Sequence, residues 1–484
     1  MDNSIQRDAQ WREEVRSSLK PKDRMAIERV KMAEVEPNVR NKSYVEVNQG
    51  LTEEQALTES KRCLDCPNPM CVTGCPVEIN IPTFIKNIER GEYLEAARVI
   101  KMTSTLPAVC GRVCPQEKQC ESKCIYNKSN KPAVAIGYLE RFAADYERNS
   151  GKMSVPETAP KNGIKVAVVG SGPAGLTCAG EMAKLGYDVT VFEALHEIGG
   201  VLKYGIPEFR LPNAIVDVEI DNLRKMGVKF ESDFIVGKTA TMDDLRADGF
   251  KGFFVASGAG LPRFMGIPGE NAIGIMSSNE YLTRVNLMHA ADENYDTPII
   301  FGKKVAVIGG GNTAMDSVRT AKRLGADRVM LIYRRSEAEM PARLEEVKHA
   351  KEEGVEFIML SNPVEYVADE KGYVSQMKVQ KMELGEPDER GRRSPVPIPG
   401  AIETIDVDLV VVSVGVSPNP LIPNSHPDLK TTQKGTLEAT EELQTTVADV
   451  FAGGDIVRGG ATVILAMGDG RKAAANLHKK LQAK

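Results

Sequence analysis

Eight of the nine cysteines lie in two short groups. The first group reads CLDCPNPMCVTGCP over residues 63–76, and the second reads CGRVCPQEKQCESKC over residues 110–124. Each contains a Cys-Pro pair, and C-x2-C spacing occurs once. Zinc ribbons usually pair two C-x2-C knuckles, whereas bacterial-type iron–sulfur sequences place cysteines closely and use a Cys-Pro that reaches a second cluster. We predict two [4Fe–4S] clusters; zinc or a mixed site is the alternative.

A dinucleotide-binding fingerprint occupies residues 164–194. A β-branched run enters Gly170-x-Gly172-x-x-Gly175, a helical pattern follows, and a second apolar strand ends at Glu193. The glycines allow a tight turn, close approach of the backbone to a pyrophosphate, and close helix–strand packing. The helix N-terminus offers N–H donors to the phosphates, and Glu193 can accept from a ribose hydroxyl. The stretch predicts a Rossmann unit that binds a dinucleotide.

A second fingerprint follows later in the chain. It repeats the plan of strand, turn, helix and strand, with Gly309-x-Gly311 in the turn and alanine in the third position. Its second strand ends in Tyr-Arg-Arg, so Arg334 and Arg335 stand where an acidic residue usually binds the ribose. An arginine there can bind a 2′-phosphate, which predicts an NADPH-selective site. Solvated surface arginines are the alternative.

The C-terminal stretch indicates a flavin in the first site. A short strand ends at Gly454-Asp455, and a glycine-rich turn leads to a helix that begins near Thr462. Such a helix start suits negative charge on a flavin. Asp455 is placed to hold a ribityl hydroxyl, and capping of the helix is the alternative. Because a hydride donor is usually paired with a flavin, we predict FAD in the first site and NADPH in the second.

The composition is ordinary for a folded globular protein. The 484 residues are 42% hydrophobic and 27% charged, and a net charge of −5 offers no basic stripe for nucleic acid. No apolar run approaches the length of a membrane span, and residues 1–20 lack the apolar core of a secretory signal. We expect a cytoplasmic protein with neither nucleic-acid nor membrane partners. Cys178 lies alone in an apolar helical stretch and is expected to be a buried side chain without a role.

Several stretches resemble one known family. They are EEQALTESKRCLDCPNPMCVTGCPVEINIPTFI, LPAVCGRVCPQEKQCESKC, AIGYLERFAADY, GGVLKYGIPEFRLP, GGGNTAMD with YRR, and VFAGGDIVRGGATV. Over residues 35–484 the chain is similar to the small (β) subunit of NADPH-dependent glutamate synthase. Its relatives are the large subunit of NADH-dependent ferredoxin:NADP oxidoreductase and the N-terminal half of dihydropyrimidine dehydrogenase.

The resemblance implies a ligand set that crosses between the two cysteine groups. In that family the first cluster is held by residues that match Cys63, Cys66, Cys71 and Cys124. The second is held by residues that match Cys75, Cys114, Cys120 and, from the segment GYLERF, Glu140. Cys110 would then be spare. The alternative is a second cluster held by four cysteines, with Cys110 as the fourth ligand.

The same resemblance implies contacts to both dinucleotides. Residues that match the following positions are expected to touch FAD: Gly200, Leu202, Arg210, Val236, Gly454, Asp455, Thr462 and Val463. Those that match Asn312, Thr313 and Gly415 approach NADPH. Because hydride transfer needs positioning rather than an acid or a base, we name no catalytic side chain.

The predicted fold class is α/β, with two Rossmann-like dinucleotide-binding domains preceded by a mainly α-helical iron–sulfur domain. The NADPH domain is inserted in the FAD domain, as the order of the motifs requires. We expect an N-terminal extension at 1–50, a helical domain with two clusters at 51–159, an FAD-binding domain at 160–288 and 414–484, and an NADPH-binding domain at 289–413. The extension is expected to be solvated, with a docking arm as the alternative.

The expected function is that of the NADPH-oxidising, electron-transferring subunit of glutamate synthase. Such a subunit passes electrons from NADPH through FAD and two [4Fe–4S] clusters to a large subunit that makes glutamate from glutamine and 2-oxoglutarate. The sequence shows neither an N-terminal cysteine nucleophile nor room for an FMN-binding barrel, so the expected partner is a large subunit with both; a homo-oligomer is also allowed. The alternatives are the large subunit of an electron-bifurcating NADH-dependent ferredoxin:NADP oxidoreductase with a small flavin or iron–sulfur partner, a stand-alone NADPH:acceptor reductase, and a non-catalytic scaffold.

Overall fold

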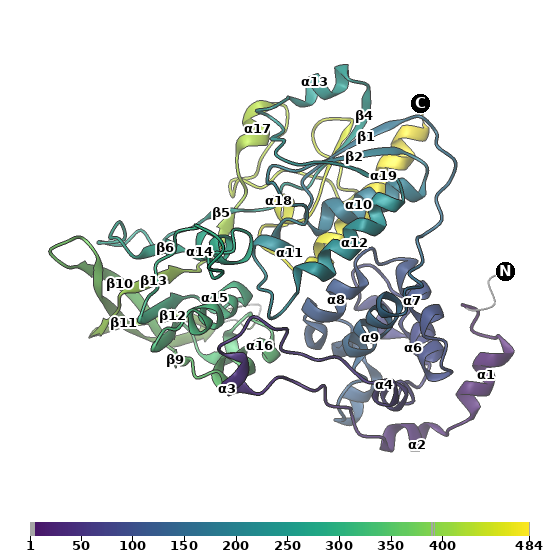
Figure 1. Ribbon diagram of the computed structural model, residues 1–484, viewed down its shortest axis with the longest axis horizontal. Coiled ribbons are helices and arrows are strands. Elements are labelled where there is room, and N and C mark those ends of the chain that lie inside the picture. Colours follow the sequence, from purple (N-terminus) through teal and green to yellow (C-terminus); the bar gives the residue numbers. More distant parts are fainter. Residues whose placement is uncertain (1–4, 389–390, 392, 484) are drawn as a thin grey trace.

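The computed structural model describes residues 5–388, 391 and 393–483. Figure 1 shows a helical part made by the N-terminal third of the chain, and two sheet-containing parts that the later residues form. The helical part lies beside both of the others (Figure 1). No helix in the described residues is both long enough and apolar enough to cross a membrane.

The helical part frames the two cysteine groups. In chain order it contains α1 (Gln10–Ser17), α2 (Pro21–Ala26), α3 (Pro37–Arg40), α4 (Glu53–Ser60), α5 (Met70–Thr73), α6 (Ile81–Glu89), α7 (Tyr93–Lys101), α8 (Pro107–Val113) and α9 (Ile136–Asn149). Apolar residues at helical spacing, such as Ile81, Phe84 and Ile88 on α6, are buried. The cysteines lie in the loops and short helices between the longer helices, so the packed faces hold the ends of each cysteine loop.

The first Rossmann domain is a five-stranded parallel sheet. Its strand order is β15-β4-β1-β2-β3, from β15 (Val450–Ala452), β4 (Phe250–Val255), β1 (Lys165–Val169), β2 (Asp188–Phe192) and β3 (Lys229–Glu231). The helices on it include α10 (Pro173–Lys184), α11 (Val201–Tyr204), α12 (Asn213–Lys225), α13 (Met242–Ala247), α18 (Asp455–Arg458) and α19 (Val463–Gln482). A Cβ on Gly470 of α19 would lie 2.3 Å from the Ala174 carbonyl oxygen, so α19 packs directly on α10. The C-terminal strand thus returns to the sheet that the first fingerprint begins, as predicted.

The second Rossmann domain is inserted between β4 and β15. Its parallel sheet has the order β6-β13-β7-β8-β9, from β6 (Ile275–Ser277), β13 (Leu409–Val412), β7 (Lys304–Ile308), β8 (Arg328–Ile332) and β9 (Glu356–Ile358). The helices are α14 (Ser278–Asn286), α15 (Asn312–Arg323) and α16 (Leu344–Glu352), and α17 (Leu421–Ser425) follows the return crossing. Since β6 is hydrogen-bonded to β13, the chain enters this sheet before residue 288, earlier than the predicted crossing. A three-residue edge strand has too little pattern to be found by sequence.

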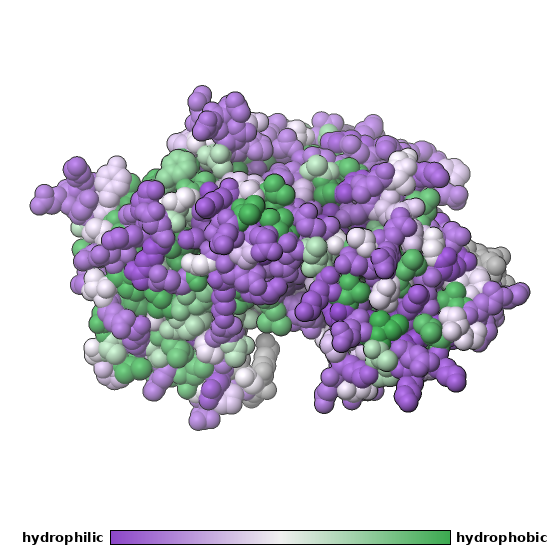
Figure 2. Space-filling model, turned by 60° about the horizontal axis from the view of Figure 1, so that its bottom comes forward, coloured by the Kyte–Doolittle hydropathy of each residue, from purple (hydrophilic) through white to green (hydrophobic). Residues whose placement is uncertain are grey.

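A three-stranded antiparallel sheet extends the second domain. It consists of β10 (Ser361–Ala368), β11 (Val374–Pro387) and β12 (Arg393–Asp406), and a two-stranded pair, β5 (Leu261–Pro262) with β14 (Val416–Ser417), marks the crossing between domains. Figure 2 shows apolar side chains on the left part of its face, the end that carries β10–β12 in Figure 1. Exposed apolar residues of β12 are Val396, Ile398 and Ile402.

Residues 33–49 form a strap that joins the three parts, so the expectation of a solvated extension is wrong for this stretch. The Val35 N–H donates to the Val47 carbonyl and the Gln49 N–H to Ala33, which makes a hairpin. The Val47 N–H donates to the carbonyl of Phe209 in the first Rossmann domain. The tip of the strap carries Arg40, which is 1% exposed. The sequence looked polar because the buried groups are charged and find their partners far along the chain.

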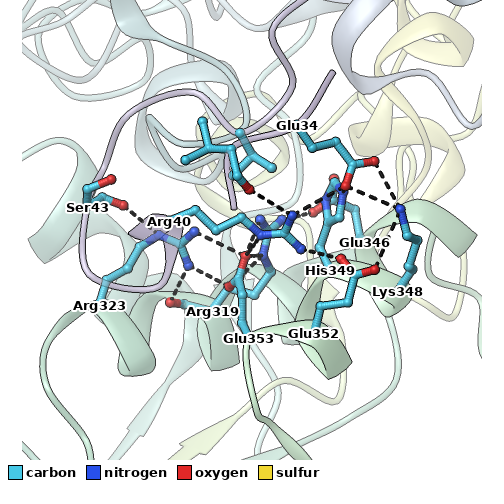
Figure 3. Close-up of polar contacts among 12 residues, drawn as sticks. Glu34, Arg40, Ser43, Arg319, Arg323, Glu346, Lys348, His349, Glu352 and Glu353 are labelled. Carbon is cyan, nitrogen blue, oxygen red and sulfur yellow. Dashed lines mark hydrogen bonds and ion pairs between the residues drawn. The ribbon is translucent and has the colours of Figure 1, made fainter. Parts of the chain in front are cut away.

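Arg40 enters a buried ion-pair network on α15 and α16 (Figure 3). Its guanidinium lies 2.6 Å from Glu352 and 3.0 Å from Glu353. Arg319 and Arg323 of α15 also donate to Glu353, and the Arg323 Nε donates to the Ser43 carbonyl at 2.9 Å. Three guanidinium groups therefore share one carboxylate between the strap and the second domain.

The network predicts a loss of stability in acid. Burial alone would raise the pKa of Glu353, but the hydrogen bonds and charges of Arg323 and Arg319 have the larger effect and lower it to about 2. For Glu346, burial likewise raises the pKa, Arg319 lowers it, and the result is also a pKa of about 2. A carboxyl group whose pKa is lower in the folded than in the unfolded protein stabilises the fold at any pH above its unfolded pKa. This stabilisation is lost as the pH falls toward the folded pKa. We expect the Tm to fall between pH 4.5 and pH 2, measured by calorimetry. Glu346→Gln should flatten the dependence of Tm on pH; an unchanged slope would count against this assignment.

Candidate functional site

The first fingerprint forms the predicted turn at the carboxyl end of β1. Gly170 has a φ of +101°, and a Cβ there would lie 2.5 Å from the Ala256 carbonyl oxygen. A Cβ on Gly175 would lie 1.9 Å from the Gly170 carbonyl oxygen, which shows how closely α10 packs on the turn. At Gly172 a Cβ would meet no atom within 4 Å, so this side of the turn is open to a pyrophosphate.

Glu193 lies beside this turn, at the carboxyl end of β2. Its carboxylate accepts from the Ser171 N–H at 2.9 Å and the Ser171 hydroxyl at 2.6 Å. Gly200, at a φ of +55°, brings a second loop to the turn, because a Cβ there would lie 3.0 Å from the Gly172 Cα. Leu202 follows in α11 and is fully buried. The acid, the turn and the second loop surround the N-terminus of α10.

The C-terminal segment reaches the same place. A Cβ on Gly454 would lie 3.0 Å from the Ala174 Cβ near the start of α10. Asp455 accepts from the Ala461 N–H at 3.1 Å, and burial raises its pKa to about 6. Thr462 is the residue that caps α19, since its hydroxyl accepts from the Leu465 N–H. Asp455 is therefore not the cap of the long helix, and Val463 is the first residue of that helix.

Arg210 and Val236, which the resemblance assigns to FAD, are both buried. Val236 is 3% exposed and packs in a core cluster of the first domain. Arg210 pairs with Asp316 of α15 at 2.9 Å, and its Nε lies 3.5 Å from a Glu346 carboxylate oxygen on α16. Arg210 thus links the first Rossmann domain to the second in this structure.

The second fingerprint repeats the geometry of the first. Gly309, with a φ of +146°, would place a Cβ 2.3 Å from the Ser413 carbonyl oxygen, whereas Gly311 is open within 4 Å. Asn312 and Thr313 begin α15, and the Asn312 Oδ1 accepts from the Arg343 N–H at 2.8 Å. Gly415 follows β13 with a φ of +115° and is also open.

The two arginines after β8 differ in their surroundings. Arg334 is exposed at the carboxyl edge of the sheet. Arg335 is buried, and its Nε donates to the Arg393 carbonyl at 2.9 Å. Arg334 is therefore available to a 2′-phosphate at this edge, while Arg335 holds the start of β12.

The first predicted ligand set is brought together from both cysteine groups. Cys63 and Cys66 lie in the loop after α4, Cys71 lies in α5, and Cys124 lies near the end of the second group. Burial raises the pKa of the Cys71 thiol, and three neighbouring thiols raise it further: Cys63, Cys124 and Cys66. All nine cysteines are free thiols. The fold thus gathers the four members of this set.

The second predicted set surrounds a buried carboxylate. Glu140 of α9 is 5% exposed, its Oε1 has no hydrogen-bond partner among the described residues, and burial raises its pKa to about 8. Burial raises the pKa of the Cys120 thiol, and the nearby charges of Glu140, Cys114 and Cys75 raise it further. An unpaired buried carboxylate beside three thiols fits a metal ligand.

Cys110 lies next to the second set. It is fully buried in α8 and interacts directly with Cys114. Its sulfur also lies 3.3 Å from the Met467 Sδ on α19, with the thiol as donor. The Cys110 thiol therefore has a hydrogen-bond partner outside the set, whereas the Glu140 Oε1 has no hydrogen-bond partner among the described residues.

The distances between thiols bear on the alternative of a single zinc ion. Sulfurs that bind one zinc ion at about 2.3 Å lie at most about 4.6 Å apart. Among the described residues, no three cysteine sulfurs lie within 4.8 Å of one another. The described sulfurs thus do not form the compact three-thiol group that a single zinc ion binds.

Helix α19 joins the second set to the first Rossmann site, a role that sequence reasoning missed. The Gln119 side chain, from the second cysteine group, donates to the Thr462 hydroxyl at 3.4 Å. A Cβ on Gly468 would lie 2.9 Å from the Pro76 carbonyl oxygen, and Arg471 donates to the Val77 carbonyl at 3.2 Å. The helix that begins at the predicted flavin site thus packs along both cysteine loops.

Comparison with known proteins agrees with this architecture. Residues 164–470 match the family model of pyridine nucleotide-disulphide oxidoreductases, and residues 40–152 match that of dihydropyrimidine dehydrogenase domain II, 4Fe-4S cluster. The glutamate synthase [NADPH] small chain of Azospirillum brasilense is 38% identical over 452 residues, which cover 92% of this chain and 93% of the relative. The chain belongs to the glutamate synthase small-chain family. The Escherichia coli glutamate synthase [NADPH] small chain is 37% identical and covers 92% of this chain.

Membership of the glutamate synthase small-chain family confirms the predicted fold and enzyme class. The chain is an FAD-dependent NADPH oxidoreductase with an N-terminal 4Fe–4S domain. The structure of FprA from Mycobacterium tuberculosis in complex with NADPH has the same fold over 66% of this chain, at a TM-score of 0.56 and 19% identity. Another relative, the NADP(+)-dependent formate dehydrogenase subunit beta of Moorella thermoacetica, is 39% identical, and the matched region spans 60% of that protein.

Proposed function

We propose that this chain is the NADPH-oxidising subunit of a cytoplasmic glutamate synthase. It would carry electrons from NADPH through FAD and two [4Fe–4S] clusters to a large subunit that makes glutamate from glutamine and 2-oxoglutarate. The observation that supports this most is the contact of α19 with both sites, because Thr462 meets Gln119 between Cys114 and Cys120. The near full-length match to glutamate synthase small chains supports the choice of partner.

Residues in both Rossmann domains would bind and position the two dinucleotides. The turns at Gly172 and Gly311 present backbone N–H groups to pyrophosphates, and Glu193 accepts from a ribose hydroxyl. FAD, when bound, supplies the step from hydride acceptance to release of single electrons. The start of α19 at Thr462 offers N–H groups to negative charge on the flavin.

Each cysteine set would hold one cluster. Cys63, Cys66, Cys71 and Cys124 form the first set, while Cys75, Cys114, Cys120 and Glu140 form the second. We favour Glu140 over Cys110 as the fourth ligand of the second set, because the Glu140 Oε1 is unpaired and the Cys110 thiol faces Met467. Replacement of Glu140 by Gln, followed by iron analysis, separates these two assignments.

A second candidate is a reductase subunit that serves another acceptor. The similarity to the formate dehydrogenase subunit supports this candidate, since that relative is 39% identical over 85% of this chain, although the match spans only 60% of the relative. A bifurcating oxidoreductase with a small flavin or iron–sulfur partner falls in the same class. All of these candidates use the same NADPH, FAD and cluster sites.

The partner decides between the candidates. The tagged chain would be isolated without oxygen from its own cells, and the proteins that accompany it identified by mass. A large subunit with glutaminase and barrel domains, and NADPH-dependent glutamate formation by the complex, are the expected results. A small iron–sulfur or flavin partner, or glutamate formation that does not depend on this chain, would contradict the proposal.

Arg334 is predicted to set the preference for NADPH. Replacing it with Gln should raise KM for NADPH about 10-fold or more, because one charge-assisted contact to the 2′-phosphate is worth about 1.5–3 kcal/mol. KM for NADH should change little. Dye reduction by purified protein measures both constants. Arg328→Gln, which removes an exposed arginine paired with Glu356 on the same sheet, is the matched control. Equal changes for both coenzymes would refute this role of Arg334.

A further inference from the structure

The loop between Cys63 and Cys66 is held by arginines from the N-terminal segment. Asp65 is 1% exposed and has a φ of +50° in this loop. The Arg12 guanidinium donates two hydrogen bonds to this carboxylate, from Nε to Oδ2 at 2.9 Å and from Nη2 to Oδ1 at 2.7 Å. Arg12 is itself 2% exposed, so the pair is buried beside the first cysteine set.

Two further cations contact the backbone of the same loop. Arg7 donates to the Cys66 carbonyl at 2.9 Å and lies 3.2 Å from Asp65. Lys86 of α6 is fully buried and donates to the Cys63 carbonyl at 2.7 Å. Arg16 lies 3.8 Å from Asp65, and Glu89 pairs with Lys86. Glu13 also pairs with Arg16, and Arg24 pairs with Glu89. Five cations (Arg7, Arg12, Arg16, Arg24 and Lys86) thus face three carboxylates (Glu13, Asp65 and Glu89), so the charge around the loop is positive.

The second set has a different charge environment. The charged groups that act on Cys120 include the carboxylates of Glu121 and Glu140, and Glu140 also acts on Cys75. Glu121 is neutralised by Arg29 at 2.8 Å, whereas the Glu140 Oε1 has no hydrogen-bond partner among the described residues. As the fourth ligand, Glu140 brings the same charge as the fourth thiolate of the first set. The excess of cations around residues 63–66 therefore makes the first set the more positive of the two.

We propose that Arg7, Arg12 and Lys86 raise the reduction potential of the first cluster above that of the second. Charge and hydrogen bonds around the sulfurs tune cluster potentials, and a buried positive charge favours the reduced form, which carries one more negative charge. One electron then leaves the second cluster and reduces the first, with no bond or proton moved. The N-terminal segment thus directs electrons away from the flavin, an inference that rests on the proposed two-cluster function.

Opposite charge changes at the Arg12–Asp65 pair test this proposal. The holoprotein and its Arg12→Gln, Asp65→Asn and double variants would be titrated with dithionite and mediators, with EPR detection. Arg12→Gln should lower the reduced-to-oxidised ratio of the first cluster at fixed potential about 10-fold, or ~59 mV for one electron. Asp65→Asn should raise the reduction potential of the first cluster, and the potential in the double variant should lie between those of the two single variants. The signal missing from Cys71→Ser identifies the first cluster.

A purely structural role would give a different pattern. Arg40→Gln removes an equally buried N-terminal arginine that pairs with the second domain, and it should leave both potentials unchanged. If Arg12→Gln loses iron, Arg7→Gln, whose side chain is 37% exposed, should still lower the potential of the first cluster. Shifts of the same sign in the two single variants, or no shift, would overturn the proposal.

The titration needs both clusters but no NADPH, so it is independent of electron delivery from NADPH. Opposite shifts together with failure of NADPH to reduce either cluster would uphold the role of the arginines and refute electron delivery from NADPH.

Discussion

Cys71→Ser should lower NADPH-dependent electron transfer from the chain to its partner by at least about 100-fold, since loss of even an outer-shell partner of a metal ligand costs about 10–100-fold. Cys71 lies in α5 with three other thiols of its set around it. A hydroxyl is a poorer ligand for iron than a thiolate, so the first cluster should be lost. Reduction of FAD by NADPH should persist, because the dinucleotide sites lie on other elements.

The measurement combines iron content with two rates. Stopped-flow absorbance follows flavin reduction, and activity of the complex follows delivery to the partner. Cys178→Ala is the matched control, because Cys178 is a buried thiol in α10 outside both sets. It should retain iron and both rates. Loss of FAD in the Cys71 variant would show that the cluster and flavin sites do not form independently.

Glu353→Gln should destabilise the protein by about 3–5 kcal/mol, the usual cost of leaving buried charges without their partner. The carboxylate accepts from Arg40, Arg319 and Arg323, and its side chain is 0% exposed. A neutral amide leaves these three guanidinium groups close together without the shared anion. The strap should then loosen from α15 and α16 first, because Arg40 loses its bond to Glu353, while its pair with Glu352 and the pair of Glu34 with Lys348 remain (Figure 3).

Hydrogen exchange and calorimetry measure this effect. Amides of residues 33–49 should lose protection more than those of β1, and the Tm should fall. Glu356→Gln is the control: its pair with Arg328 is about half exposed, and such pairs contribute about 1 kcal/mol or less. Equal destabilisation by both substitutions would contradict a special role for Glu353.

The two Rossmann units were predictable because each is a local pattern. The turn, the helix start and the end of the second strand lie within about thirty residues, so spacing alone relates Gly170 to Glu193 and Gly309 to Arg334. The contact of Cys124 with the set of Cys63 came from family resemblance, since no spacing rule relates residues so far apart.

The strap and Arg210 were not predictable for a physical reason. Arg40 and Glu353 are 313 positions apart, and Arg210 and Asp316 are 106 apart. Each residue alone is an ordinary surface type, and only the fold shows that they are buried in pairs. The N-terminal arginines on Asp65 were missed for the same reason.

The position of β15 and α19 in the chain has a consequence for biosynthesis. Both belong to the first Rossmann domain, yet the ribosome makes them after the whole inserted domain. Until then β4 is an unpaired sheet edge, and the cysteine loops lack the helix that packs on Pro76 and Val77. A nascent chain can fold its second domain early but cannot complete a flavin site. Flavin binding at the proposed site should therefore follow the synthesis of α19.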